Sequence, residues 1–170
     1  MLAIAMVGWM LLVIALAAAV APAGLGEETT LRIGRGVIVT APSGWTSAAD
    51  IWEVGTEAVS LQKAGVLVGF AVEAYDGTDR ELLADQSRQL QTDFDSYRPL
   101  PVATRVVAGD LEAGVILFSG AANSGQLEGE LVAAVRGGTG VVMLAVAPSG
   151  QLRRVQGDLD RMLDTMVVPR

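Results

Sequence analysis

The sequence has 170 residues, of which 51% are hydrophobic, with no cysteine, no histidine and a formal net charge of −7. Without cysteine and histidine, the chain cannot build a Ser-His-Asp or Cys-His catalytic set, an imidazole or thiolate metal site, or a disulfide. The acidic balance argues against binding to nucleic acid or to anionic lipid head groups.

The N-terminal segment, residues 1–23, carries no charged side chain. A helix rises 1.5 Å per residue, so about 20 apolar residues cross the hydrocarbon core of a bilayer. We therefore predict a transmembrane anchor over residues 1–23. Gly8, Ala15 and Ala19 have the small side chains that let a second membrane helix approach closely, although an alanine-rich helix also produces such spacings by chance.

A cleaved signal peptide is the alternative to a retained anchor, with Ala21-Pro22-Ala23 as the small residues at a cleavage site. Signal peptides have a basic start and an apolar stretch of about 7–15 residues. Here no basic residue precedes Arg32, and the apolar run covers residues 2–20. Length favours the anchor. The missing basic residues conflict with the positive-inside rule, which a natural start upstream of Met1 would explain.

The segment after the anchor begins Gly24-Leu25-Gly26-Glu27-Glu28, which is acidic, so the positive-inside rule does not hold it in the cytoplasm. We expect a single-pass protein of the cell membrane, with residues 24–30 as a linker and residues 31–170 as one extracytoplasmic domain. A domain of this length buries a core large enough to fold without disulfides.

Strand patterns dominate the first part of the domain. They cover residues 31–41, 51–54, 58–61 and 66–75. Turn residues at Pro42-Ser43-Gly44 and Lys63-Ala64-Gly65 close two of these strands. The last of the four is almost continuously apolar, which is typical of a central strand buried on both faces.

A helix is predicted to follow, because Thr78-Asp79-Arg80-Glu81 has the pattern of a capping box. Apolar residues with one polar member then recur at helical spacing, at Leu83, Gln86, Leu90, Phe94 and Tyr97. Pro99 and Pro101 are expected to end this helix, which would lie on the sheet.

The last part of the domain reads as an antiparallel meander and a closing helix. Strand patterns cover residues 104–108, 114–119, 127–136 and 140–147. Turn residues separate them, and strands joined so tightly are antiparallel. Ser149 is predicted to cap a final amphipathic helix. Its apolar positions are Leu152, Val155, Leu159, Met162, Leu163 and Met166. This order predicts an α+β fold, an antiparallel-sheet sandwich with two helices.

The segment Val39-Thr40-Ala41-Pro42-Ser43-Gly44-Trp45 resembles the strand and Pro-x-Gly-Trp signature near the start of PsbP-like domains, including the LpqN-type lipoproteins of bacterial envelopes. The following helix, meander and closing helix are similar too, over nearly all of residues 31–168. The resemblance implies a PsbP-like fold and a non-enzymatic accessory or binding module of a larger assembly. The lipobox cysteine of LpqN-type proteins is missing, and the apolar helix would replace the lipid anchor.

One motif matches a catalytic pattern. Ser60-Leu61-Gln62-Lys63 has the S-x-x-K spacing of penicillin-interacting enzymes. Those enzymes also need a K-T-G element, and Lys63 is the only lysine of the chain. We therefore interpret the motif as a strand end and turn.

Two carboxylate pairs are candidates for acid chemistry or for a hard cation such as calcium. Glu128 and Glu130 lie two apart on a predicted strand, and Asp160 and Asp164 lie one turn apart on the last predicted helix. Solvated carboxylates explain both pairs more simply. We predict no catalytic residue, no metal site and no cofactor.

A partner or ligand surface is predicted at Trp45, Trp52, Tyr97 and Leu100. The two tryptophans bracket a segment of mixed polarity, and tryptophan buries a large area on binding. Core packing is nevertheless favoured for Trp45, and the two interpretations are about equally supported for Trp52. Tyr97 and Leu100 belong to Tyr97-Arg98-Pro99-Leu100-Pro101, which is too apolar for a merely solvated loop.

Three functions remain open from the sequence. The preferred one is a membrane-anchored, non-catalytic accessory subunit or assembly factor of an envelope membrane-protein complex. The second is a lipid or glycolipid carrier, in which Met143, Met162, Leu163 and Met166 line a pocket instead of an ordinary core. The least favoured is an enzyme that uses Glu128 and Glu130. A nucleic-acid partner is not expected.

Overall fold

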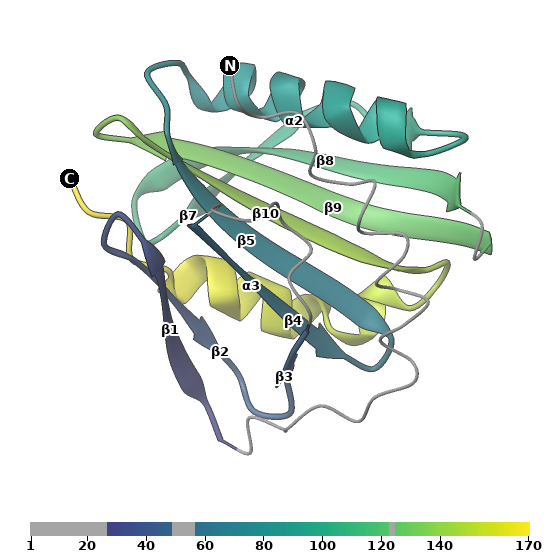
Figure 1. The fold of residues 1–170 in the computed structure, drawn as a ribbon, viewed down its shortest axis with the longest axis horizontal. Helices are drawn as coiled ribbons and strands as arrows, with labels where there is room; N and C mark the ends of the chain where they lie inside the picture. Colours follow the sequence, from purple (N-terminus) through teal and green to yellow (C-terminus); the bar gives the residue numbers. More distant parts are fainter. Residues whose placement is uncertain (1–26, 49–56, 123–124) are drawn as a thin grey trace.

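A computed structural model describes residues 27–48, 57–122 and 125–170 (Figure 1). Several predicted features lie outside these residues, namely the anchor over residues 1–23 with Gly8, Ala15 and Ala19, the strand over residues 51–54, and Trp52. Among the helices of the described residues, none is both long and apolar enough to cross a membrane.

An antiparallel sheet of eight strands forms the centre of the described part of the chain, in the order β3-β4-β5-β10-β9-β8-β6, with β7 also paired to β8. Its strands are β3 (Thr46–Ser47), β4 (Glu57–Lys63), β5 (Val66–Ala74), β6 (Arg98–Pro99), β7 (Ala103–Val107), β8 (Leu111–Ala122), β9 (Gly125–Arg136) and β10 (Thr139–Pro148). A separate hairpin consists of β1 (Thr29–Gly34) and β2 (Val37–Ala41), and the two helices are α2 (Asp79–Asp93) and α3 (Gln156–Thr165).

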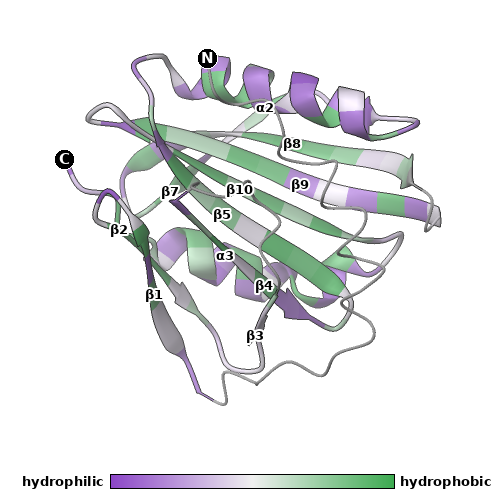
Figure 2. Cartoon of the chain, in the orientation of Figure 1, coloured by the Kyte–Doolittle hydropathy of each residue, from purple (hydrophilic) through white to green (hydrophobic). Residues whose placement is uncertain are grey.

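The sheet has a hydrophobic core on each face. Helix α2 covers one face, where Leu83 and Leu90 belong to the same buried cluster as Leu131 of β9. Helix α3 and the β1–β2 hairpin cover the other face, where Met162 packs with Val39 and other buried residues (Figure 1). Figure 2 shows apolar residues along the central strands and polar residues on the outer side of α2. The α+β sandwich predicted from the sequence is confirmed at this level.

Strand β5 is the central strand that its composition predicted. It pairs with β4 on one side and β10 on the other, and every residue from Val66 to Val72 is buried. Val68 and Phe70 face the core of α3, whereas Leu67 and Ala71 face the core of α2. Burial on both faces removes the need for alternating polar residues.

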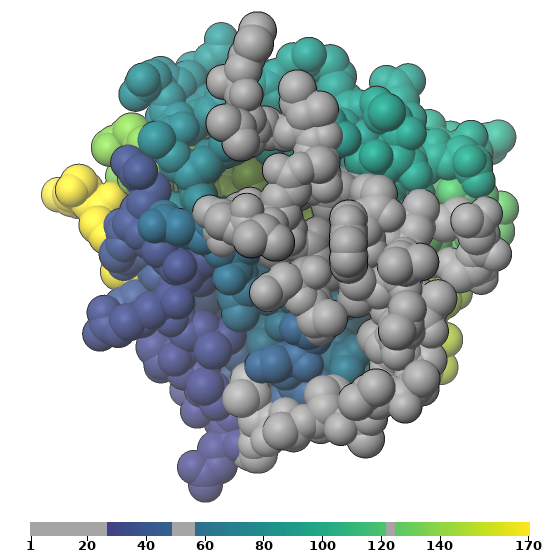
Figure 3. Space-filling model, viewed as in Figure 1, coloured from purple at the N-terminus to yellow at the C-terminus, as the bar shows by residue number. Residues whose placement is uncertain are grey.

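The single strand predicted over residues 31–41 is wrong, because this segment is the β1–β2 hairpin. The chain reverses at Arg35 and Gly36, whose φ angles are 48° and 78°. Two consecutive positive φ angles define a type I′ turn, and glycine at the second position makes that turn accessible. The C-terminal residues lie beside this hairpin (Figure 3). Ile38 N donates to Val167 O at 3.1 Å, and Val167 N donates to Ile38 O at 2.9 Å.

The capping box of α2 is confirmed. Thr78 Oγ1 accepts from Glu81 N at 3.2 Å, and Thr78 N donates to Glu81 Oε2 at 2.8 Å. The helix ends earlier than predicted, with Phe94 as its C-cap instead of continuing to Pro99. Phe94 turns into the core and packs edge-on against Phe118 at a centroid distance of 5.7 Å. This packing ends the helix before the prolines are reached.

The predicted Ser149 cap of the closing helix is wrong. The chain first forms a short 3₁₀ turn over Leu152–Arg154, and α3 begins at Gln156. Glu128 Oε1 on β9 accepts from Leu152 N at 2.8 Å, so a sheet carboxylate satisfies the free amide of this turn. The predicted apolar stripe is confirmed, because Leu159, Met162 and Leu163 are buried.

Glu73 near the end of β5 gives a pH-dependent prediction. Burial, and next the negative charge of Asp85, raise the pKa of its carboxyl above 4.5. Stability therefore falls as the pH rises from about 4.5 through the raised pKa. We expect Glu73→Gln to increase the free energy of unfolding at pH 7 and to give no gain at pH values well below 4.5, as measured by urea unfolding.

The exposed Glu112→Gln on β8 controls for the loss of one negative charge. An equal gain from both substitutions at pH 7, or a gain from Glu73→Gln that persists at acid pH, would contradict the assignment.

Candidate functional site

The exposed hydrophobic residues gather at one edge of the sheet. Four large apolar side chains lie there, and we call them the apolar edge. They are Leu100, Val102, Val106 and Leu117. They are between 45% and 58% exposed, and the described residues have one further large apolar side chain of this exposure, Val167 at 51%. Exposed hydrophobic residues along one sheet edge make this edge the candidate interaction site.

Two prolines shape this edge. The segment over residues 98–107 runs antiparallel to β8, and Leu100 N still donates to Leu117 O at 2.8 Å. Pro99 and Pro101 have no N–H to donate, so proline is tolerated only at a sheet edge or a bulge. Pro99 pairs with Phe118 and Ala103 pairs with Val115, so four steps along the segment oppose three along β8. This extra residue is a bulge, and Leu100 and Val102 protrude from it.

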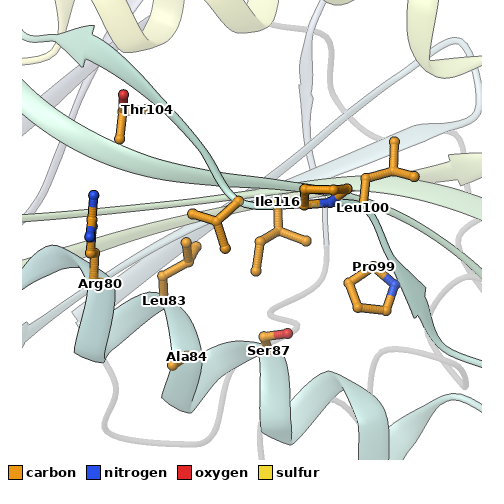
Figure 4. A pocket seen from close by; sticks show the side chains of 10 residues that line it. Arg80, Leu83, Ala84, Ser87, Pro99, Leu100, Thr104 and Ile116 are labelled. Atoms are coloured by element: carbon orange, nitrogen blue, oxygen red, sulfur yellow. The ribbon is translucent and has the colours of Figure 1, made fainter.

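A first groove, the helix groove, lies between this segment and α2. Its volume is about 620 Å³, which is within the range of small-molecule sites. Leu83, Ala84 and Ser87 line it from α2, Pro99 and Leu100 line it from the segment, Ile116 lies between them, and Arg80 stands at one end (Figure 4). The groove is therefore mostly apolar with one cationic end.

A second groove, the arginine groove, involves residues on the other side of the same edge. Its volume is about 320 Å³. The residues that line it include Leu117 of β8, Leu152 and Arg153 of the 3₁₀ turn, and Arg98 of β6. Leu100 lines both grooves and so stands at the centre of the candidate site.

Of the predicted surface residues, Leu100 and Tyr97 lie at this site with different roles. Leu100 is 58% exposed. Tyr97 is half-buried, with its ring 5.2 Å from that of Phe118 and its hydroxyl 2.9 Å from Ser87 Oγ. Burial raises the pKa of the Tyr97 phenol. Tyr97 therefore joins the middle of α2 to the sheet instead of offering its ring to a partner.

Trp45 is a core residue, which corrects its assignment to the partner surface. Its side chain is 0% exposed. Its Nε1 donates to Asp158 Oδ2 at 3.0 Å, and Lys63 Nζ approaches the same oxygen at 2.6 Å. Lys63 also donates to Ser43 O at 2.9 Å. One carboxylate on α3 thus holds the loop after β2 and the end of β4.

The S-x-x-K pattern does not form a nucleophile and base. Ser60 and Lys63 lie three residues apart on β4, and an odd spacing on a strand directs the two side chains to opposite faces. Ser60 is buried, and Lys63 is paired with Asp158. The motif therefore belongs to the framework.

The two predicted carboxylate pairs occupy structural positions. Glu130, at 3% exposure, accepts from Gln156 Nε2 at 3.0 Å. Arg105 on β7 holds Asp160 at 2.9 Å, Asp164 at 3.4 Å and Glu130 at 3.8 Å. Three of the four carboxylates thus converge on one guanidinium, while Glu128 binds the 3₁₀ turn. No group of three or more acidic side chains in the described parts of the chain has the arrangement of a metal site.

The three methionines and one leucine considered for a lipid pocket are also part of the core. Met143, Met162, Leu163 and Met166 are at most 4% exposed and belong to the cluster between the sheet and α3. They line neither groove. The residues that the sequence analysis missed are Val102, Val106, Leu117, Arg98 and Arg153. In the sequence, only the two prolines of this segment indicate the site, because a strand pattern does not reveal whether the strand lies at the edge of a sheet.

Comparison with known proteins establishes the fold. No family model matches the sequence, and no curated protein matches it either. Solved structures do match. Cyanobacterial PsbP (CyanoP) from Synechocystis sp. PCC 6803 is 9% identical over 89% of this chain and 98% of its own, with a TM-score of 0.63. LpqN of Mycobacterium tuberculosis, described as involved in cell envelope biogenesis, is 10% identical over 85% of this chain and 91% of its own, with a TM-score of 0.64.

The Ran-binding protein Mog1p of Saccharomyces cerevisiae also matches, at 15% identity over 84% of this chain and 95% of its own, with a TM-score of 0.56. The chain therefore has a PsbP-like, LpqN-type fold, which confirms the resemblance carried by Pro42-Ser43-Gly44-Trp45. At these identities the similarity concerns the fold and assigns no site residue.

The carboxylate of Asp158 gives a stability prediction. Asp158→Ala leaves the buried indole N–H of Trp45 without an acceptor and Lys63 without its partner. We expect the free energy of unfolding to fall by about 1–3 kcal/mol, as measured by urea unfolding.

The matched control is Asp164→Ala on the same helix, because Asp164 is 62% exposed and its pair with Arg105 lies at the surface. It should lower the free energy of unfolding by no more than about 1 kcal/mol. Equal effects of the two substitutions would show that Asp158 does not hold Trp45 in place.

Proposed function

We propose that this protein is a non-catalytic accessory subunit or assembly factor of an envelope membrane-protein complex. Residues 1–23 anchor it in the cell membrane, the described domain lies outside the cytoplasm, and the apolar edge docks on a partner protein. The observation that carries the proposal is the apolar edge itself. Four of the five exposed large hydrophobic side chains in the described residues lie there. The chain as a whole is acidic, with a net charge of −7, so this apolar edge is not explained by solubility.

The geometry of the edge supports protein docking. Pro99 and Pro101 fix the backbone on both sides of Leu100, so little conformational entropy is lost when a partner binds. Grooves on both sides of Leu100 can receive side chains of a partner. A rigid apolar anchor between two hollows is typical of an interface hot spot.

The residue types of the chain and the contacts of its carboxylates support the proposed absence of catalysis. The sequence has no histidine or cysteine. The carboxylates that were candidates for acid chemistry are engaged with Arg105, Gln156 and Leu152 N. The similar fold of LpqN, which is described as involved in cell envelope biogenesis, supports an envelope role.

The alternative function is a lipid or glycolipid carrier. The helix groove favours it, because about 620 Å³ lined mainly by apolar side chains accommodates part of an acyl chain. Native mass spectrometry of the gently purified chain separates the two functions. A carrier retains lipid, whereas an accessory subunit is recovered with a membrane protein in fixed stoichiometry.

Charge in the apolar edge tests partner docking. We expect the double substitution Leu100→Asp and Val106→Asp to lower recovery of the partner complex from mildly solubilised membranes by about tenfold or more, since hot-spot losses exceed about 1.4 kcal/mol. Both side chains are more than half exposed, so the urea midpoint should stay close to that of the unchanged protein.

Val167→Asp is the matched control, because Val167 is 51% exposed outside this edge. Partner recovery that is equally low in the control and the double variant would overturn the docking surface. A form of the chain that begins at Glu27 tests the anchor separately. If this form recovers the same partners, residues 1–23 serve only as a tether.

A further inference from the structure

The arginine groove combines an apolar surface with two guanidinium groups. Leu117 and Leu152 contribute apolar side chains, and Arg98 and Arg153 contribute cations. Both arginines are exposed. Neither is within ion-pair distance of a carboxylate in the described residues, whereas Arg105, Arg136 and Arg161 are each paired. Arg32, Arg35, Arg80 and Arg154 also have no ion pair among the described residues, so the distinguishing feature of Arg98 and Arg153 is that both line one hollow.

The charge of this groove is opposite to that of the whole chain. Its ionisable lining residues are two arginines and Glu128, so its formal charge is 2 − 1 = +1, against −7 for the protein. Glu128 does not pair with either arginine, because its Oε1 accepts from Leu152 N at 2.8 Å. The amide of Gln156 is likewise occupied by Glu130 and Asp160. The charged donors left for a ligand are therefore the two guanidinium groups, and Ser119 adds a hydroxyl to the lining.

Chemistry and size together restrict the ligand. A guanidinium binds phosphate or carboxylate oxygens through parallel N–H donors, and such charge-assisted hydrogen bonds are about twice as strong as neutral ones. The volume of about 320 Å³ is at the lower end of small-molecule sites, so a short alkyl segment fits and a whole diacyl lipid does not. Leu100 and Leu117, at the same hollow, remain exposed to water until such a segment covers them.

We propose that the arginine groove is a binding site for an anionic amphiphile, whose phosphate or carboxylate group pairs with Arg98 and Arg153 and whose alkyl chain covers Leu100 and Leu117. This site goes beyond the accessory-subunit proposal, and it shares Leu100 and Leu117 with the apolar edge. It also refines the expectation from composition, because the acidic surface as a whole disfavours anions while this groove attracts them.

Hexyl phosphate is the probe, because it is soluble and carries both chemical features. The full chain is held in phosphatidylcholine nanodiscs, with empty nanodiscs as the blank, and binding of the radiolabelled probe is measured by equilibrium dialysis. Inorganic phosphate tests the head group alone, and hexyl glucoside tests the same alkyl chain with a neutral head. We expect hexyl phosphate to bind at least about tenfold more tightly than either, since a hydrogen bond to a charged group contributes about 1.5–3 kcal/mol.

Arg153 and Arg154 provide a matched pair of variants. They are neighbours on the same 3₁₀ turn and both are exposed, but only Arg153 lines the groove. R98Q and R153Q should each weaken hexyl phosphate binding about fivefold or more, and R154Q should leave it within about twofold.

The proposal is overturned if R153Q and R154Q behave alike, if hexyl glucoside binds as tightly as hexyl phosphate, or if inorganic phosphate alone reproduces the affinity. Circular dichroism of each variant confirms that the fold is retained, and binding that fails in the unchanged protein also overturns the site. The two proposals share Leu100 and Leu117, but R98Q and R153Q change neither residue. Probe binding and partner recovery are measured separately, so failure of one proposal is distinguishable from failure of the other.

Discussion

The candidate site depends on one backbone constraint, which is that Pro99 and Pro101 cannot donate hydrogen bonds to β8. The segment over residues 98–107 therefore pairs with β8 in two short pieces, with a bulge between them. Leu100 remains fixed by its own N–H on Leu117 O. The result is an apolar side chain held outside the sheet and flanked by two grooves. Prolines also protect an edge strand from pairing with another sheet, so the proposed docking at this edge uses side chains and not strand pairing.

The rigidity of that edge comes from the two cores behind it. Strand β8 pairs with β9 from Ala113 to Ala122, and α2 and α3 pack on opposite faces of the sheet. Glycines on β8 let α2 lie close to it, because a Cβ at Gly114 would come within 2.8 Å of Leu83 Cδ2. On the other face, Asp158 fixes α3 to Trp45 and Lys63. The grooves are therefore shaped by elements that are themselves held in place.

Local patterns in the sequence predict the framework well. The capping box at Thr78, the central strand β5 and the meander all depend on residues close together in the chain, and the structure shows each of them. The β1–β2 hairpin was missed, because apolar residues on both sides of Arg35-Gly36 mimic one continuous strand. The last helix begins later than predicted, because the chain first forms a 3₁₀ turn, whose Leu152 N donates to a carboxylate 24 residues away.

The site is predicted less well, because it depends on long-range placement. Sequence identified Leu100 from the unusual run of apolar residues after the helix, but spacing alone does not show that Leu117 is beside it. Trp45 and the carboxylates were chosen for their chemistry, and their actual roles depend on partners such as Asp158 and Arg105 that lie far away in the chain. Which strand lies at the edge of the sheet, and which charged side chains pair with one another, is determined only by the folded structure.

The central claim is that the apolar edge contacts a membrane partner in the intact envelope. The most direct measurement places a photo-crosslinking amino acid at position 100 or at position 167 of the full chain, irradiates intact cells, and compares the adducts by mass spectrometry. The account predicts one abundant adduct with a membrane protein from position 100 and none of that adduct from position 167. The same adducts from both positions, or none from position 100, would contradict it.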